Sequence, residues 1–400
     1  MNPTTHRAPT RVLGALGLAT GLALAATACS ATEPSPAADG ATGSAVPHGF
    51  VEGASESREP QLRLLAVSAT GETVLHDLLT AETTTLDPID APRHSATDGR
   101  FLVTSDAERT TVVDGGAWTV DHGDHTHYYA AEPRVVGTLD GGGPVEVHSS
   151  ETTTTITWPE RGEAVALDRD ALGQGDVEQR AAVDASVLLP FGEHLVQAGD
   201  DGVRVLDGDG RAASGTAPQA CTEPTGGIVT RAGAVVGCAD GAVVVDDDGG
   251  TTFVELPDGA ERPTAFAARS GRPTVAGVAG TTGAWLLDAR DRSWRHLATE
   301  RPLRTVVAVD DADEHVVGVD DQGRVVVLTA ATGAVATTEP LIDAGADTDA
   351  VPLLQLDAQR AYLADPDDGV VHEIDFADGA RVARTIALPI APAAFAEVGL

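Results

Sequence analysis

The sequence predicts an all-β fold, a β-propeller, on three observations. Short runs of Val, Leu, Ile and Ala recur along the chain, and a glycine-containing turn introduces most of them. These runs recur about every 40 residues, which suits a propeller blade of several short strands and excludes the shorter helical repeats. No window shows a convincing helical period, apart from a single turn at residues 169–172.

Eight copies of one strand motif define the repeat. They begin at Gly71, Arg109, Gly162, Gly202, Gly241, Gly283, Gly323 and Gly369. A further strand lies between copies, so each unit is predicted to contain a strand, an Asp/Gly turn, a second strand and a partner. Eight copies predict eight blades. Seven blades are the alternative, if the Gly71 copy closes the ring by pairing with residues 384–388. A two-domain β-sandwich is the main rival, and the even period argues against it.

Residues 1–28 have the pattern of a bacterial lipoprotein signal peptide. Arg7 and Arg11 precede an apolar stretch at residues 12–26 that is too short to span a bilayer comfortably. Small residues then lead into Cys29, which we expect to be acylated and to begin the mature chain. An ordinary cleaved signal peptide with a chance cysteine is the alternative. Residues 29–46 lack apolar periodicity and are expected to be a disordered tether. Residues 47–400 would then form the propeller, held by lipid on the extracytoplasmic face of the cell membrane.

Charge and composition exclude several classes of function. The chain has 61 acidic and 26 basic residues, and its formal net charge of -35 makes nucleic acid an unexpected partner, because phosphate binding needs a basic surface. Contact with the membrane is expected through the lipid anchor only, and the protein is expected to be a monomer. An enzyme is not expected, because there is no Gly-x-Ser-x-Gly elbow, phosphate-binding glycine loop or telling nucleophile–base spacing.

Two cysteines remain once Cys29 is assigned to lipid. Cys221 and Cys238 form an even pair in a chain expected to reach an oxidising compartment, and their spacing allows them to lie on adjacent strands or on a strand and its loop. We therefore expect a disulfide. Two thiolate ligands to a metal ion are the alternative.

Metal-ligating residue types are concentrated in an insertion between the second and third copies. His122, His125 and His127 lie there within six residues, together with Asp121 and Asp124. His125 and His127 would share one face of an extended segment, and His122 or the carboxylate of Asp124 would supply a third ligand. Such ligands favour zinc, with copper or nickel as competitors. The alternative is a polar loop whose histidines make ordinary hydrogen bonds.

Two further histidines are weaker candidate ligands. His148 and His194 lie near strand starts in neighbouring blades, so either side chain could point into the central channel. The alternative is that both are turn or rim side chains.

Three stretches of the chain resemble the AztD-type zinc metallochaperones, in an actinobacterial lipoprotein form. They are residues 47–54 (PHGFVEGA) continued by 59–64 (EPQLRL), residues 120–129 (VDHGDHTHYY) continued by 133–137 (PRVVG), and residues 237–241 (GCADG). The resemblance implies a β-propeller that binds zinc outside the cytoplasmic membrane and hands it to the solute-binding protein of a zinc ABC transporter. It carries His122, His125 and His127 over as ligands.

The sequence also departs from that family. The resemblance implies further histidines near residues 183–188 and just after Cys221, and this chain has none in either place. It could bind zinc more weakly, use Asp184 or Glu223 instead, or have become a non-metal binder. The alternative function is therefore a tethered propeller that binds a protein partner and whose metal site has decayed.

Overall fold

A computed structural model describes residues 49–123, 125–213, 217–343 and 351–400. The predicted signal peptide, the tether and Cys29 lie outside the described residues, as does Asp124. In the described part of the chain, no helix is long and apolar enough to cross a membrane.

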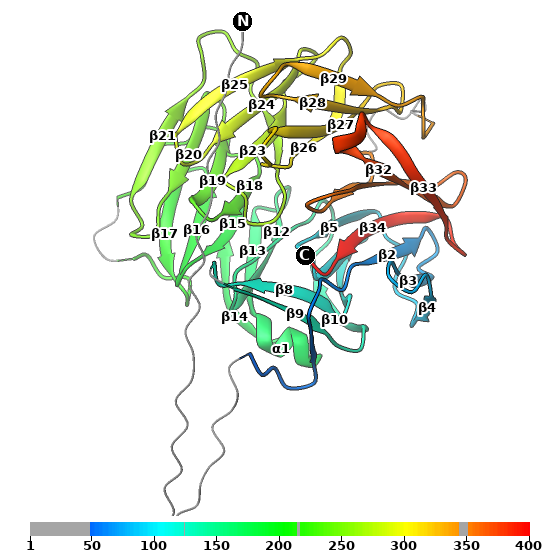
Figure 1. The fold of residues 1–400 in the computed structure, drawn as a ribbon. Helices are drawn as coiled ribbons and strands as arrows, with labels where there is room; N and C mark the ends of the chain where they lie inside the picture. Colours follow the sequence, from blue (N-terminus) through cyan, green and yellow to red (C-terminus); the bar gives the residue numbers. More distant parts are fainter. Residues whose placement is uncertain (1–48, 124, 214–216, 344–350) are drawn as a thin grey trace, which may run out of the picture. The chain divides into compact units, whose positions relative to one another are not determined.

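The described residues form antiparallel β-sheets, in agreement with the predicted all-β class (Figure 1). The first three sheets, each from its innermost strand outward, are β34 (Pro392–Val398), β2 (Arg63–Ser68), β3 (Thr73–Asp77) and β4 (Thr83–Leu86); β5 (His94–Thr97), β6 (Phe101–Ser105), β7 (Arg109–Asp114) and β10 (Arg134–Asp140); and β11 (Glu146–Ser149), β12 (Thr153–Trp158), β13 (Glu163–Asp168) and β14 (Gln179–Asp184). The next two are β15 (Val187–Phe191), β16 (His194–Gly199) and β17 (Gly202–Asp207); and β18 (Gly227–Thr230), β19 (Gly233–Cys238), β20 (Gly241–Val245) and β21 (Thr251–Glu255).

Three further sheets complete the series, and one small sheet stands apart. The three are β22 (Thr264–Ala267), β23 (Thr274–Val278), β24 (Gly283–Asp288) and β25 (Ser293–Ala298); β26 (Leu303–Ala308), β27 (His315–Asp320), β28 (Val325–Thr329) and β29 (Ala334–Thr337); and β30 (Leu354–Leu356), β31 (Ala361–Asp365), β32 (Val370–Asp375) and β33 (Arg381–Ala387). The small sheet consists of β1 (Ser55–Ser57), β9 (Thr126–Ala130) and β8 (Ala117–Asp121).

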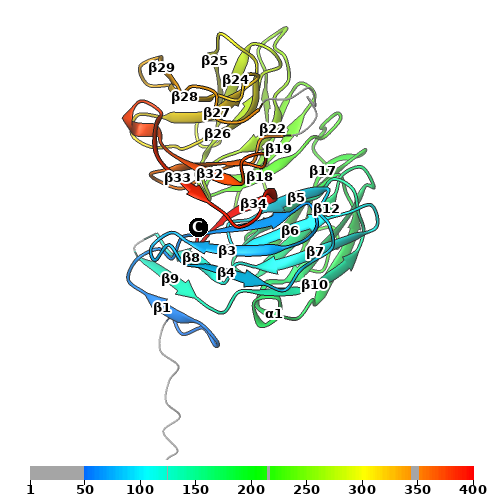
Figure 2. The same cartoon turned by 90° about the vertical axis from the view of Figure 1, so that its right-hand side faces the viewer.

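The arrangement is that of a β-propeller, as predicted. The first strands of nearly all neighbouring sheets in the series pack against one another, so the sheets follow one another around a common centre (Figures 1 and 2). Each of the eight repeat copies supplies the third strand of a different sheet, from β3 to β32. The sequence period therefore corresponds to one sheet per copy.

The ring is closed by a different segment from the one named in the seven-blade alternative. Residues 384–388 fall largely within β33, which pairs with β32 and completes the preceding sheet. The strand that pairs with β2 is β34, from Ala394↔Val67 to Val398↔Arg63. The proposed pairing of residues 384–388 was therefore wrong. β34 is buried over nearly its whole length, as an innermost strand should be, whereas β33 is half exposed.

The core consists of apolar side chains packed between neighbouring sheets. Central strands such as β20 are buried along their whole length, because each sheet has another sheet on both faces. Only one short α-helix, α1 (Arg169–Gln174), and one 3-10 turn, η1 (Phe376–Asp378), occur among the described residues. The helix lies at the predicted helical turn, and the Asp168 carboxylate caps it by accepting from the Ala171 amide.

The predicted disulfide is present. Cys221 and Cys238 are joined, with their Cα atoms 5.2 Å apart, and both are buried in the core shared by the sheets of β15–β17 and β18–β21. Cys238 ends β19 and Cys221 lies in the connection that precedes β18. The alternative of two thiolate metal ligands is therefore wrong.

Candidate metal centre

Three histidines of the insertion form one cluster. His122, His125 and His127 each offer a ligand nitrogen, and these atoms all lie within 4.8 Å of one another. Their ring centroids are 4.9 to 5.4 Å apart. A group of at least three His, Cys, Asp or Glu side chains can hold a metal ion, and among the described residues these three histidines form such a group. The structure thus brings together the three histidines predicted from the sequence.

The hairpin of β8 and β9 produces this geometry. Asp121 pairs with Thr126 at its tip, and the His122 amide donates to the His125 carbonyl at 3.0 Å, so the intervening turn is tight. Gly123 has φ +90°, a conformation that a residue with a Cβ atom adopts with strain. Its amide donates to the Asp121 carboxylate at 2.7 Å, which fixes the turn. The turn therefore folds His122 back toward His125 and His127.

Glu56, which the sequence analysis missed, orients the most buried histidine of the cluster. Strand β1 pairs with β9, opposing Glu56 to Tyr129. The Glu56 Oε1 atom lies 2.7 Å from Nδ1 of His127, whose residue is 7% exposed. A carboxylate on one ring nitrogen fixes the tautomer and directs the other nitrogen toward a metal. The only signal in the sequence was that Glu56 lies between residues 47–54 and 59–64, which together carry part of the resemblance.

A stack of planar groups attaches the hairpin to the propeller. The Arg100 guanidinium carbon lies 3.7 Å from the centroid of the Trp118 ring, and Asp114 holds Arg100 with two hydrogen bonds of 2.8 and 3.1 Å. Trp118 stacks on Tyr129 at 5.2 Å, and Tyr129 lies over His127 at 6.0 Å. The stack therefore runs from a buried ion pair of the propeller to a ligand of the cluster.

Hydrogen bonds to main-chain carbonyls join the same hairpin to Gly49 and to residues 399–400. The Thr119 hydroxyl donates to the Gly399 carbonyl at 2.7 Å, and its amide donates to the Leu400 carbonyl at 3.2 Å. The Tyr129 hydroxyl donates to the Gly49 carbonyl at 2.8 Å, and burial, with the nearby Glu56 carboxylate, raises the pKa of that phenol. An added Cβ at Gly49 would lie 2.8 Å from Cε1 of His127, so the chain passes directly over the ligand ring.

Asp121 connects the hairpin to a neighbouring part of the propeller face. Its carboxylate forms an ion pair with Arg231, which lies in the turn between β18 and β19. The Gly123 amide lowers the pKa of the Asp121 carboxyl group, and Arg231 and Arg272 lower it further. Asp121 therefore stays ionised and fixes the turn from both sides.

The other predicted ligands lie elsewhere. His148 is on β11, with Nε2 3.8 Å from Oε2 of Glu146, and His194 begins β16 opposite Asp207. Neither belongs to the described cluster, so their role as ligands stays a prediction. Asp124 lies outside the described residues, and its role stays a prediction too.

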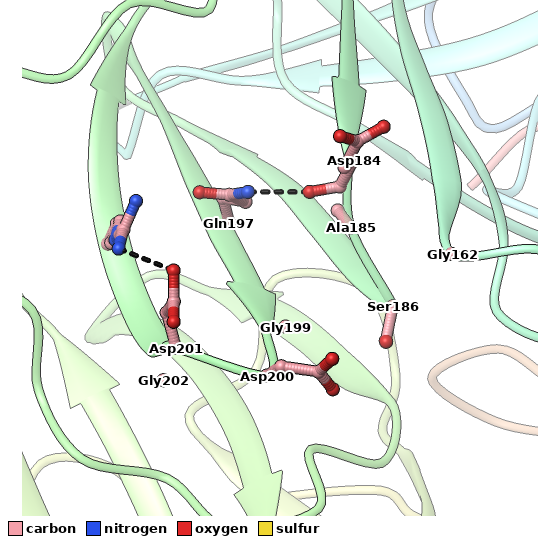
Figure 3. Close-up of a pocket in the computed structure, with 10 residues that line it drawn as sticks. Gly162, Asp184, Ala185, Ser186, Gln197, Gly199, Asp200, Asp201 and Gly202 are labelled. Atoms are coloured by element: carbon pink, nitrogen blue, oxygen red, sulfur yellow. Dashed lines mark hydrogen bonds and ion pairs between the residues drawn. The ribbon is translucent and has the colours of Figure 1, made fainter.

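The two carboxylates considered as replacements for missing histidines are also outside the cluster. Glu223 pairs with Arg262 at 2.8 Å. Asp184 ends β14 beside a hollow of about 470 Å³, where its carbonyl accepts from the Gln197 amide and Asp201 pairs with Arg204 (Figure 3). Neither carboxylate supplies a fourth ligand to the three histidines in this structure.

Comparison with known proteins places the fold. No family model matches the sequence, and no curated protein matches it. Two solved structures of AztD from Citrobacter koseri, one of them apo, superpose with TM-scores of 0.70 at 16% and 15% identity, covering 85% of this chain and 98% of theirs. The dihydro-heme d1 dehydrogenase NirN superposes with a TM-score of 0.53 at 14% identity, covering 86% of this chain and 76% of that one. The chain therefore has the AztD-type β-propeller fold, with a cluster of three histidines on an inserted hairpin.

Proposed function

We propose that this protein binds zinc outside the cytoplasm and delivers it to the solute-binding protein of a zinc ABC transporter. The observation that carries the proposal is the convergence of His122, His125 and His127 on one point of an AztD-type fold. Zinc is the cargo in this proposal, so the protein is a carrier rather than an enzyme.

The geometry of the cluster suits zinc. Zn–N bonds are about 2.0–2.1 Å long, so two ligand nitrogens of a tetrahedral site lie about 3.3 Å apart. The ligand atoms of the triad are within 4.8 Å of one another, and small rotations of the rings close that difference. His122 and His125 are exposed, whereas His127 is buried and held by Glu56.

Three histidines also leave one position of a tetrahedral ion open. Structural zinc sites fill all four positions with protein ligands, whereas sites that exchange a ligand keep one position for water or a partner. An acceptor protein can enter that fourth position and take over the ion one ligand at a time. A site with three ligands among the described residues, at the exposed tip of a hairpin, is therefore suited to transfer.

The first experiment measures zinc affinity with the full chain in mild detergent, by competition with a chromogenic chelator. We expect one zinc ion per chain, and we expect His125→Ala/His127→Ala to lose tight binding with an unchanged far-UV spectrum. The matched control is His94→Ala/His296→Ala, which removes two exposed histidines of the propeller sheets. Equal affinity in the wild type and the cluster variant would refute the site. Absence of zinc from every form would favour the non-metal interaction propeller.

The proposed location is the extracytoplasmic face of the cell membrane, through lipid on Cys29. The sequence pattern around Cys29 supports this, and it lies outside the described residues. Replacing Cys29 by Ala is expected to move the protein from the membrane fraction to the soluble one, and retention of the variant in the membrane would contradict the anchor.

A further inference from the structure

A large hollow lies beside the metal-binding hairpin. It has a volume of about 950 Å³, and one part of its wall is the hairpin itself, through Trp118, Val120 and Asp121. Another part consists of Arg231 and residues 269–272, which belong to the turns after β18 and β22. The hollow is therefore shared between the metal-binding insertion and the propeller face, and its remaining wall also carries the carboxylates of Glu59, Asp98, Glu151, Asp170 and Asp357.

Two arginines of this wall form no close ion pair among the described residues, although the charges of Asp310, Asp311 and Asp357 act on Arg269 from further away. The Nε atom of Arg269 donates to the Val309 carbonyl at 3.0 Å, and no ion pair of Arg269 or Arg272 occurs in the described ranges. Both are partly buried. This is unexpected in a chain with 61 acidic and 26 basic residues, where most arginines have a carboxylate within reach.

The two guanidinium groups also repel each other. Burial lowers the pKa of Arg269, and the positive charge of Arg272 lowers it further. The acids that act on Arg269 each hold another group: Asp310 accepts from the Thr274 hydroxyl at 2.5 Å, and Asp311 lies 2.6 Å from the ring of His315. Asp357, which lines the same hollow, accepts from the Gln359 and Arg360 amides at 2.6 and 2.7 Å. An anion bound between the arginines would relieve this repulsion.

The third arginine connects the wall to the metal cluster. Arg231 pairs with Asp121, which directly precedes His122, and both side chains are partly exposed, at 51% and 37%. Exposed ion pairs contribute about 0–1 kcal/mol, so another carboxylate can displace Asp121 at little energetic cost. Loss of this pair would remove one of the contacts that hold the turn carrying His122 and His125, while the Gly123 amide still donates to Asp121.

We propose that Arg231, Arg269 and Arg272 form a carboxylate-binding site for an acidic segment of the protein that exchanges metal with the triad. Guanidinium groups bind carboxylates through paired hydrogen bonds, and three of them along one wall fit more than one acidic side chain. A carboxylate that takes Arg231 from Asp121 loosens the hairpin, so docking of the partner and release of the metal are coupled. This inference rests on the proposed function.

The test uses metal-free full-length protein and a fluorescein-labelled tetraglutamate peptide, followed by fluorescence anisotropy. We expect saturable binding that weakens at least tenfold in Arg269→Gln/Arg272→Gln. The matched control, Arg211→Gln/Arg292→Gln, removes the same charge from two exposed turns and should bind within twofold of the wild type. Equal binding in the wild type and the pocket variant overturns the proposal. If succinate displaces the peptide at an equal concentration, the arginines bind a free dicarboxylate as well as an acidic polypeptide. That result would overturn the proposal that the carboxylate comes from a protein segment.

A second measurement separates this inference from the proposed function. Zinc affinity is measured on the same variants, and Arg269→Gln/Arg272→Gln should retain it, because neither arginine contacts the triad. In zinc-loaded wild type, tetraglutamate should speed zinc transfer to a chelator, and in the pocket variant it should not. If no form of the protein binds zinc, the proposed zinc-carrier function and its coupling to docking are refuted. If the peptide still binds in a way that depends on Arg269 and Arg272, the carboxylate-binding site is retained. An unchanged transfer rate in the wild type would overturn the coupling.

Discussion

The stack of Arg100, Trp118 and Tyr129 should determine how tightly the metal is held. We consider Trp118→Leu, which keeps an apolar side chain on β8 and removes the flat ring between Arg100 and Tyr129. Trp118 belongs to the small sheet of β1, β8 and β9 rather than to a sheet of the propeller series. The substitution therefore tests the position of the hairpin without removing a core residue between propeller sheets.

The expected size of the effect follows from the two contacts that are lost. The guanidinium carbon of Arg100 is 3.7 Å from the Trp118 ring centroid, and such a cation–π contact contributes about 0.5–2 kcal/mol. The Trp118–Tyr129 pair, at 5.2 Å, contributes about 0.5–1.5 kcal/mol beyond burial. Together they amount to about 1–3.5 kcal/mol. If zinc requires the docked hairpin, affinity falls about 5- to 300-fold, because each 1.4 kcal/mol is a factor of ten.

The assay compares zinc affinity, thermal unfolding and amide hydrogen exchange of residues 117–130 in three forms of the protein. Trp294→Leu is the control, since it removes a partly buried tryptophan from β25, near Phe266 and Trp285 and away from the hairpin. We expect weaker zinc binding and faster exchange in the hairpin for Trp118→Leu, and unchanged zinc affinity for Trp294→Leu. Zinc affinity within twofold of the wild type for Trp118→Leu would refute the reasoning, because the hairpin would then hold its geometry without the stack.

Three further predictions concern other parts of the molecule. Glu56→Gln weakens the hydrogen bond that orients His127, so zinc affinity should fall about 10- to 100-fold, measured by chelator competition. The Cys221–Cys238 disulfide spans 17 positions, so its removal in Cys221→Ala/Cys238→Ala should lower the free energy of unfolding by about 3 kcal/mol in urea titrations. Burial raises the pKa of Glu397 well above its usual value, so this group opposes folding as the pH rises above about 4.5. Glu397→Gln should therefore raise the urea midpoint more at pH 8 than at pH 5, and an equal gain at both would contradict a protonated buried carboxyl.

Much of the fold was predictable because propeller sheets repeat a local pattern. Each glycine-led strand motif, from Gly71 to Gly369, lies in the third strand of its own sheet, where buried apolar runs recur at nearly constant spacing. The disulfide was predictable because only two cysteines remained after Cys29. The closing strand was not, because β33 and β34 are both seven-residue strands near the C-terminal end of the described chain, and pairing with β2 is what makes β34 the closing strand.

The candidate site was predictable in part for a similar reason. His122, His125 and His127 are neighbours in the sequence, and one tight turn suffices to bring their rings together. Their supporting residues are not neighbours. Glu56 and Arg231 are 71 and 110 positions away from their partners, and nothing in their local sequence marks them.

The sequence by itself determined the class of fold, the repeat, the disulfide and the three candidate ligands, because each depends on residues close together in the chain or on a count of one residue type. Tertiary structure alone decided which strand closes the ring, that β1 joins the hairpin, and that Arg100, Glu56 and Arg231 hold it in place. Those contacts depend on how distant segments pack around the propeller, and that packing is set by the whole chain rather than by any one segment of it.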